Sequence, residues 1–227
     1  MGQFVTLNSE DGFEFAAYVA RPAGKPQAAV VVLQEIFGVN PHIQSMADVY
    51  AAAGYLAIAP STFARAKPDV VLGYTEADMN AGFALKATAE AHADKVLDDI
   101  QAAIDYADDE TDGGKVGIVG YCWGGLLSWR AACELDGLSA AVTYYGGGMT
   151  AEHAREPTCP VLSHFGDQDA YIPLDGVEAF KVAQPEVQVH IYPANHGFNC
   201  DARGSYNEAA AKTARERSLA FFAEHLA

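Results

Sequence analysis

Residues 115–125 read KVGIVGYCWGG, a short apolar run followed at once by a glycine-rich turn around a cysteine. The apolar run is typical of a buried strand, and a helix is predicted from the turn to about Cys133. The turn has the pattern Gly-x-nucleophile-x-Gly, which holds a nucleophile on a sharp bend between a strand and a helix. On such a bend the thiol of Cys122 lies at a helix N-terminus, where the helix dipole favours a thiolate.

The rest of the chain alternates predicted strands and helices around this unit. Strands are predicted at 4–7, 13–20, 28–34, 55–59, 138–145, 161–165 and 187–192. Helices are predicted at 42–53, 76–93, 94–107, 174–182 and 206–226. The Asp-Gly pair at 11–12 indicates a hairpin between the first two strands. We therefore expect a single α/β domain over 1–227, with a mostly parallel sheet, helices on both faces and an N-terminal antiparallel hairpin.

The composition of the chain limits the kinds of molecule that it is expected to bind. The chain has 227 residues, half of them hydrophobic, and 30 acidic against 14 basic side chains give a net charge of −16. An anionic surface argues against binding to nucleic acid or an anionic membrane. No basic segment followed by an apolar one opens the chain, and no apolar run is long enough to span a membrane. The four cysteines form no CxxC pair, which favours a reducing, cytoplasmic location.

Neither a metal nor an organic cofactor is expected. Six further histidines show no His/Cys spacing typical of a metal site; they are His42, His92, His153, His164, His190 and His225. The glycines at 146–148 lack the spacing of a phosphate-binding loop.

Two other strand ends carry residues that can complete a catalytic triad. Asp169 follows the strand at 161–165, and His196 follows the strand at 187–192. The chain order Cys122, Asp169, His196 is that of the α/β-hydrolase fold. His196 is the predicted general base and acid, and Asp169 the residue that fixes its tautomer. Asp167 stays open as an alternative acid.

The end of the strand at 28–34 is the fourth candidate segment, with the sequence QEIFG. Hydrolases supply one oxyanion-hole N–H at this place and another from the residue after the nucleophile, which here are Ile36 and Trp123. Glu35 is unusual there, because a carboxylate close to a thiol discourages thiolate formation.

Taken together, these motifs resemble the dienelactone hydrolase family (carboxymethylenebutenolidases), a branch of the α/β-hydrolase fold. The resemblance runs nearly end to end and rests on QEIFGVN at 34–40, KVGIVGYCWGG at 115–125, YYG at 144–146, HGF at 196–198 and ARER at 214–217. It implies a cofactor-free hydrolase that opens enol-lactones through an acylated cysteine. It also implies that Cys122, Asp169 and His196 are the triad. Glu35 would be the residue that meets the thiol as the thiol switches between a resting and an attacking state.

The chain departs from this family at the substrate carboxylate. Well-known members hold it with two arginines, but residues 73–80 contain no arginine and the position four after His196 is Cys200. Arg203 is the predicted replacement, with Arg65 and Lys67 as alternatives. The expected pocket lining also includes three aromatic residues at strand ends or after the catalytic histidine, Tyr144, Tyr145 and Phe198.

The predicted activity is hydrolysis of a small lactone or ester, in which Cys122 attacks and water releases the acyl group. A broad carboxylesterase or thioesterase would use the same triad. A non-catalytic redox-sensing module built on Cys122 is the alternative from another class. The expected partner is a small molecule, and the expected assembly is a monomer or small homo-oligomer.

Overall fold

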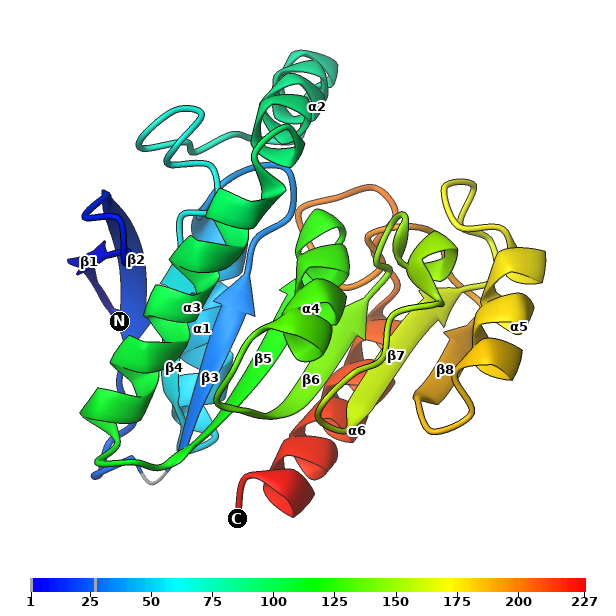
Figure 1. The fold of residues 1–227 in the computed structure, drawn as a ribbon. Coiled ribbons are helices and arrows are strands. Elements are labelled where there is room, and N and C mark those ends of the chain that lie inside the picture. The colour runs from blue at the N-terminus through cyan, green and yellow to red at the C-terminus, as the bar shows by residue number, and fades with distance from the viewer. Residues whose placement is uncertain (1, 27) are drawn as a thin grey trace.

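The computed structural model describes residues 2–26 and 28–227, which form one eight-stranded sheet in the order β1-β2-β4-β3-β5-β6-β7-β8 (Figure 1). Met1 and Gln27 belong to the predicted domain but lie outside the described residues. The strands are β1 (Gln3–Asn8), β2 (Glu14–Ala20), β3 (Ala28–Leu33), β4 (Leu56–Pro60), β5 (Lys115–Tyr121), β6 (Leu138–Tyr144), β7 (Val161–Gly166) and β8 (Gln188–Tyr192). The helices are α1 (Pro41–Ala52), α2 (Glu76–Glu90), α3 (Ala93–Glu110), α4 (Trp123–Glu134), α5 (Leu174–Ala183) and α6 (Glu208–His225), with a short 3-10 helix η1 (Met149–Glu152).

The strand directions confirm the predicted fold class. β1 and β2 pair antiparallel, β2 pairs antiparallel with β4, and every other neighbouring pair is parallel. Helices lie in the connections between the parallel strands, and between β6 and β7 that helix is only the short η1. Helices therefore cover both faces of the sheet. Figure 1 shows α3, α4 and α5 on the near face and α1 and α6 on the far face.

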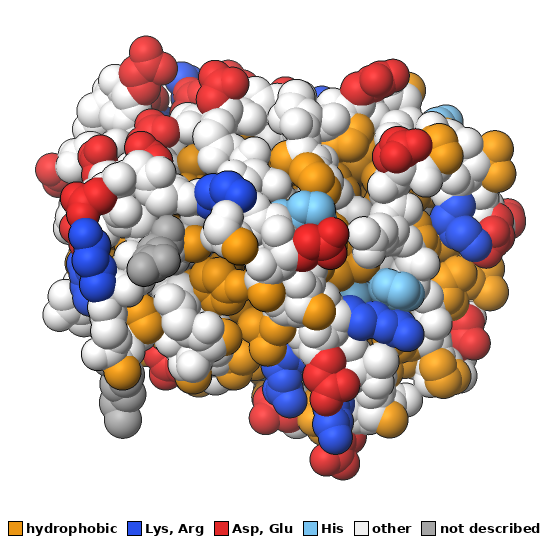
Figure 2. Space-filling view, turned by 90° about the horizontal axis from the view of Figure 1, so that it is seen from below, with side chains coloured by type: hydrophobic (Ala, Val, Ile, Leu, Met, Phe, Trp, Pro, Cys, Tyr) orange, Lys and Arg blue, Asp and Glu red, His pale blue; other side chains and the backbone are white. Residues whose placement is uncertain are grey.

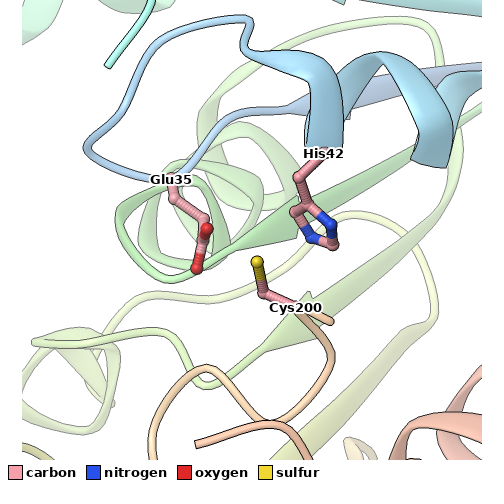
Figure 3. Close-up of side chains that lie close together, drawn as sticks. All are labelled: Glu35, His42 and Cys200. Carbon is pink, nitrogen blue, oxygen red and sulfur yellow. The ribbon is translucent and has the colours of Figure 1, made fainter. Parts of the chain in front are cut away.

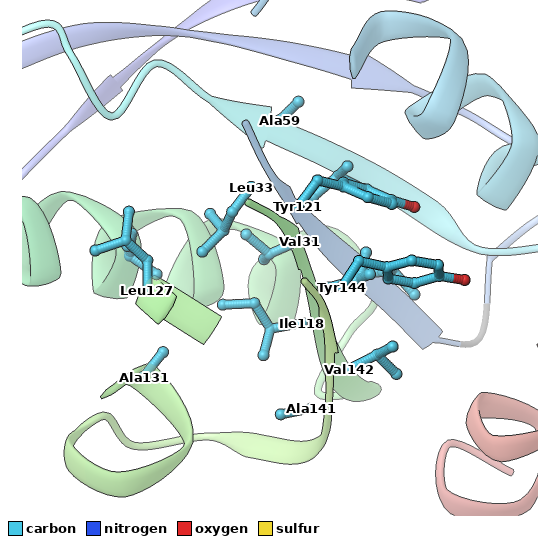
Figure 4. Close-up of a cluster of buried hydrophobic side chains, with 14 of the residues drawn as sticks. Val31, Leu33, Ala59, Ile118, Tyr121, Leu127, Ala131, Ala141, Val142 and Tyr144 are labelled. Atoms are coloured by element: carbon cyan, nitrogen blue, oxygen red, sulfur yellow. The ribbon is translucent and has the colours of Figure 1, made fainter. Parts of the chain in front are cut away.

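The centre of the sheet is buried on both faces. All six residues of β3 are buried, as are six of the seven residues of β5. In Figure 4, Val31 and Ile118 point toward Leu127 of α4, whereas Tyr121 and Tyr144 lie on the other side of the sheet. Each such aliphatic side chain contributes about 1.5–3 kcal/mol when fully buried. The carboxyl ends of β3, β5, β6, β7 and β8 lie at one edge of this sheet, where the candidate residues lie.

The predicted element boundaries differ from the structure by a few residues. The final helix begins at Glu208, two residues later than predicted, because the Asn207 side chain accepts the Ala210 N–H and caps the helix there. The 3-10 helix η1 after β6 was not predicted.

No helix in the described part of the chain is long and apolar enough to cross a membrane. The face at the amino ends of the parallel strands, seen in Figure 2, carries acidic and basic side chains close together with hydrophobic ones between them. That face offers no continuous basic surface of the kind that nucleic acid requires.

Candidate active site

Cys122 occupies the bend between β5 and α4 in a strained backbone conformation. Its φ and ψ are +56° and −116°, which a residue with a side chain rarely adopts. Such a conformation costs about 1–3 kcal/mol and persists only where the surroundings enforce it. Two backbone hydrogen bonds hold Cys122 in this conformation. The Cys122 N–H donates to the Tyr144 carbonyl (3.0 Å), and the Gly125 N–H donates to the Cys122 carbonyl (3.0 Å).

The glycines on either side of Cys122 are required by close backbone contacts. A Cβ on Gly120 would lie 1.9 Å from the Gly124 carbonyl oxygen, and a Cβ on Gly124 would lie 2.5 Å from the Gln34 carbonyl oxygen. Both distances are well inside van der Waals contact and involve backbone atoms that have little freedom to move. The Gly-x-Cys-x-Gly pattern is thus a packing requirement of this bend.

The structure brings Cys122, His196 and Asp169 into one hydrogen-bonded row. His196 Nε2 lies 3.1 Å from Cys122 Sγ, and His196 Nδ1 lies 2.7 Å from Asp169 Oδ2. The other oxygen of Asp169 accepts the Tyr171 N–H at 2.8 Å. Asp167, the alternative acid, is exposed at the end of β7, so Asp169 is the carboxylate that meets the imidazole.

The environment of His196 favours its protonated form. Burial alone would lower its pKa, but the negative charge at the Cys122 sulfur and the hydrogen bond to Asp169 outweigh burial. Together they raise the pKa of His196 from 6.5 to about 10. The imidazole is therefore charged at neutral pH when the sulfur beside it is charged.

Glu35 is bound to Arg203 at the edge of this row. Its Oε1 accepts the Arg203 Nη1 hydrogen at 3.0 Å, while its Oε2 has no hydrogen-bond partner among the described residues. The Glu35 side chain is 1% exposed and the Arg203 side chain 13%. Gly197 makes this pair possible, because a Cβ there would lie 2.3 Å from Arg203 Nη1. Arg203 also lies over the Phe37 ring, 5.7 Å from its centre.

The two predicted oxyanion-hole residues flank Cys122 with unused backbone donors. Ile36 lines the same pocket as Cys122, and Trp123 is the first residue of α4. Within the described residues, neither N–H donates to another protein group. The Trp123 ring is anchored, since its Nε1 donates to Glu90 at 2.6 Å and its ring stacks on Phe63 with centres 4.9 Å apart. Both N–H groups thus remain free to receive a developing negative charge.

A pocket that opens to solvent and has a cavity volume of about 70 Å³ lies above the thiol. Its walls are mostly apolar, and the lining residues are Ile36, Phe37, Met79, Phe83, Lys86, Cys122, Gly147, Tyr171, His196 and Arg203. Lys86 has no ion-pair partner within the described chain, unlike Arg203. The pocket therefore contains one uncommitted cation.

The sequence reasoning missed the contribution of α2 to this pocket. Met79, Phe83 and Lys86 are spaced i, i+4 and i+7, which puts them on one face of the helix. That spacing was visible in the sequence, but nothing in it indicated that this face covers the Cys122 bend.

Four of the other predicted substrate contacts lie elsewhere. Tyr144, Tyr145 and Phe198 are at most 1% exposed and pack beneath the site, and the Tyr145 ring meets His196 edge-on at 5.1 Å. Arg65 is tied to Asp99 and Asp11 in a different pocket.

Lys67, the other alternative cation, is exposed and does not line the pocket above Cys122. The local sequence does not reveal where these predicted contact residues lie in the fold. Their positions depend on which carboxylates and which helices are neighbours in space.

In this mostly parallel sheet, the strained bend after β5 bears a thiol, and the loops after β7 and β8 bear a carboxylate and an imidazole. This arrangement defines an α/β hydrolase. The chain belongs to the dienelactone hydrolase family: the model of that family matches residues 15–226. It is therefore a hydrolase of ester bonds, and the interpretation as a non-catalytic redox module loses its support.

Curated relatives agree with this assignment over nearly the whole chain. The carboxymethylenebutenolidases of Pseudomonas putida and Pseudomonas knackmussii are each 35% identical over 228 residues, covering 96% of this chain and 95% of theirs. A solved structure of a provisionally named dienelactone hydrolase from Klebsiella pneumoniae superposes with a TM-score of 0.85. It is 32% identical, with coverage of 99% of this chain and 98% of that one.

Proposed function

We propose that this chain, acting as one domain, hydrolyses a small enol-lactone or ester through an acyl-cysteine intermediate on Cys122. The observation that carries the proposal is the row from Cys122 Sγ through His196 to Asp169, with contacts of 3.1 Å and 2.7 Å. The name of the Pseudomonas relatives, carboxymethylenebutenolidase, supports a lactone as the substrate.

The first half of the reaction forms the acyl-enzyme. The Cys122 sulfur attacks the carbonyl carbon, the C–S bond forms, and the carbonyl oxygen takes up negative charge near the N–H groups of Ile36 and Trp123. The ring or ester C–O bond then breaks as the oxygen that leaves takes a proton from His196. The raised pKa of His196 suits this step, because the imidazolium already holds the proton to be donated.

The second half releases the acyl group, and here the environment of His196 changes. An acylated sulfur carries no negative charge, so the interaction that most raises the pKa of His196 is lost. Burial then favours the neutral imidazole, which removes a proton from the attacking water. Water oxygen bonds to the carbonyl carbon, the C–S bond breaks, and the sulfur is restored. Asp169 keeps the tautomer in which Nε2 faces the reacting atoms.

Glu35 acts as a positioning residue for the thiol in this proposal. Its carboxylate is held by Arg203, which leaves Cys122 paired with His196 in the arrangement that suits attack. A shift of Glu35 toward Cys122 would give the resting arrangement that the family resemblance implies.

The substrate proposed for this pocket is small, largely apolar and carries one carboxylate. The lining is mostly apolar, which suits an unsaturated ring, and Lys86 is the uncommitted cation that would meet the carboxylate. Tyr144, Tyr145 and Phe198 support the floor of the site through packing rather than substrate contact. The four unpaired cysteines of the described chain support a reducing, cytoplasmic setting.

The test combines turnover with detection of the intermediate. Cys122→Ala should abolish hydrolysis of lactones and activated esters, while a Cys133→Ala control should retain it. Mass spectrometry of wild-type protein quenched during turnover should reveal one added acyl group, located on Cys122. A Cys122→Ala protein with wild-type rates would overturn the proposal. A panel of carboxylated lactones, neutral esters and thioesters separates the lactonase from the carboxylesterase and thioesterase alternatives.

A further inference from the structure

A buried cluster of three metal-ligating side chains lies beside the catalytic pocket. Glu35 comes from the loop after β3, His42 from the start of α1, and Cys200 from the loop before α6. One ligand atom from each lies within 4.8 Å of the other two. Figure 3 shows the three side chains pointing toward one another from separate parts of the chain.

The side chains of this cluster are buried, and those of Glu35 and His42 carry polar atoms without partners, whereas the Cys200 thiol contacts the Tyr74 hydroxyl and the Ala202 N–H. Glu35 and His42 are 1% and 5% exposed, and Cys200 is fully buried. Among the described residues, Glu35 Oε2 and both ring nitrogens of His42 form no hydrogen bond. A buried polar group left without a partner costs about 1–3 kcal/mol. Glu35 Oε2 and one ring nitrogen of His42 therefore indicate a missing partner between them.

We propose that Glu35, His42 and Cys200 bind a single divalent cation of the zinc class. A thiolate, an imidazole and a carboxylate are the ligand types that zinc takes in proteins. Tetrahedral zinc with these ligands places the ligand atoms about 3.4–3.6 Å apart. Atoms that now lie within 4.8 Å of one another therefore need to approach by at most about 1.4 Å. Binding replaces the Cys200 S–H proton, which passes to solvent, with a metal–sulfur bond.

The surroundings of the cluster suit a cation. Asp201 Oδ1 lies 3.7 Å from His42 Nδ1, which leaves His42 Nε2 for the metal and gives the imidazole an outer carboxylate. Glu35 keeps Oε1 on Arg203 and offers Oε2. The Cys200 thiolate and Asp201 together balance the two positive charges of the ion.

This site departs from the sequence-based expectation that the chain binds no metal. That expectation rested on local spacing, whereas these ligands come from three segments that only the fold brings together. The site shares Glu35 with the proposed reaction but uses neither Cys122 nor His196, so its test is independent of hydrolysis.

The test uses Cys122→Ala protein, so that the catalytic thiol cannot contribute a ligand. After removal of metals with a chelator, Co²⁺ should produce a near-ultraviolet sulfur-to-cobalt absorption band that saturates at one equivalent. When the metal-free protein is loaded with Zn²⁺ instead, elemental analysis after gel filtration should find one Zn²⁺ per chain. Adding Cys200→Ser or His42→Gln should weaken Zn²⁺ binding at least tenfold, and the Cys200 change should also abolish the band.

His92→Gln is the matched control, because His92 is exposed and lies outside the cluster. It should leave binding unchanged, and circular dichroism should verify that each variant is folded. If Cys200→Ser fails to fold, His42→Gln decides alone. Absence of stoichiometric binding, or binding that neither variant weakens, would overturn the proposal.

Discussion

Removing Arg203 should destabilise the protein by leaving a buried carboxylate without its counterion. The Glu35 side chain is 1% exposed, and the one hydrogen bond that its carboxylate accepts within the described residues comes from Arg203. Breaking a buried ion pair by removing one member costs about 3–5 kcal/mol. Because Arg203 is 13% exposed, some water reaches the pair, and we expect about 3 kcal/mol for Arg203→Met. For a chain of this length that lowers Tm by about 6–12 °C.

The assay is thermal unfolding at pH 7 in the presence of a chelator, applied to Arg203→Met, Glu35→Gln and the double variant. The double variant should be more stable than Arg203→Met by about 1–2 kcal/mol, because a buried neutral amide needs no counterion. Lys25→Met is the control, since the Lys25–Asp112 pair is 73% and 75% exposed. Its loss should change stability by less than about 1 kcal/mol.

Two results would refute this reasoning. One is an Arg203→Met protein that melts within about 2 °C of wild type. The other is a double variant no more stable than Arg203→Met, which would mean that the loss comes from packing of the long arginine side chain rather than from an uncompensated Glu35 charge.

Three further predictions concern pH, substrate charge and the bend. Because folding raises the pKa of His196 from 6.5 to about 10, its contribution to stability is full below pH 6.5 and is lost as the pH rises toward 10. Between pH 7 and 10, the free energy of unfolding measured with urea should thus fall more for wild type than for His196→Gln. Parallel curves of this free energy against pH would contradict the prediction. Lys86→Gln should raise KM for a carboxylated lactone about tenfold while leaving a neutral ester within about twofold, and steady-state kinetics with equal effects on both would argue against a carboxylate contact. Gly124→Ala should cost about 1–3 kcal/mol or prevent folding, because its Cβ would lie 2.5 Å from the Gln34 carbonyl oxygen. A matched Gly147→Ala change, with no atom within 4 Å of the added Cβ, should unfold like wild type, and denaturation midpoints check both.

The sheet and the Cys122, Asp169 and His196 positions were predictable from the sequence because each depends on local patterns. Apolar runs mark the strands, and in a parallel sheet the carboxyl ends of strands meet at one edge. Residues that follow those runs are therefore expected to be neighbours, even when they are 74 residues apart, as Cys122 and His196 are.

The pocket wall was not predictable in the same way. The sequence placed Lys86 on a helix, and its spacing from Met79 and Phe83 put all three on one face. The orientation of that helix over Cys122 depends on packing between elements. Tyr144 and Phe198 were expected to line the pocket, but neither does. Packing between elements buries both rings beneath the site.

By itself, the sequence determined the fold class and the Gly-x-Cys-x-Gly bend, because a strand, a turn and the start of a helix respond to residues only a few positions away. Only the tertiary structure decided which charges pair and which ligands gather. Glu35 and Arg203 are 168 residues apart, and Glu35, His42 and Cys200 come from three different loops or helix ends. Electrostatic and ligand contacts act over a few ångströms of space, so their partners are determined by how the folded chain packs and not by separation along it.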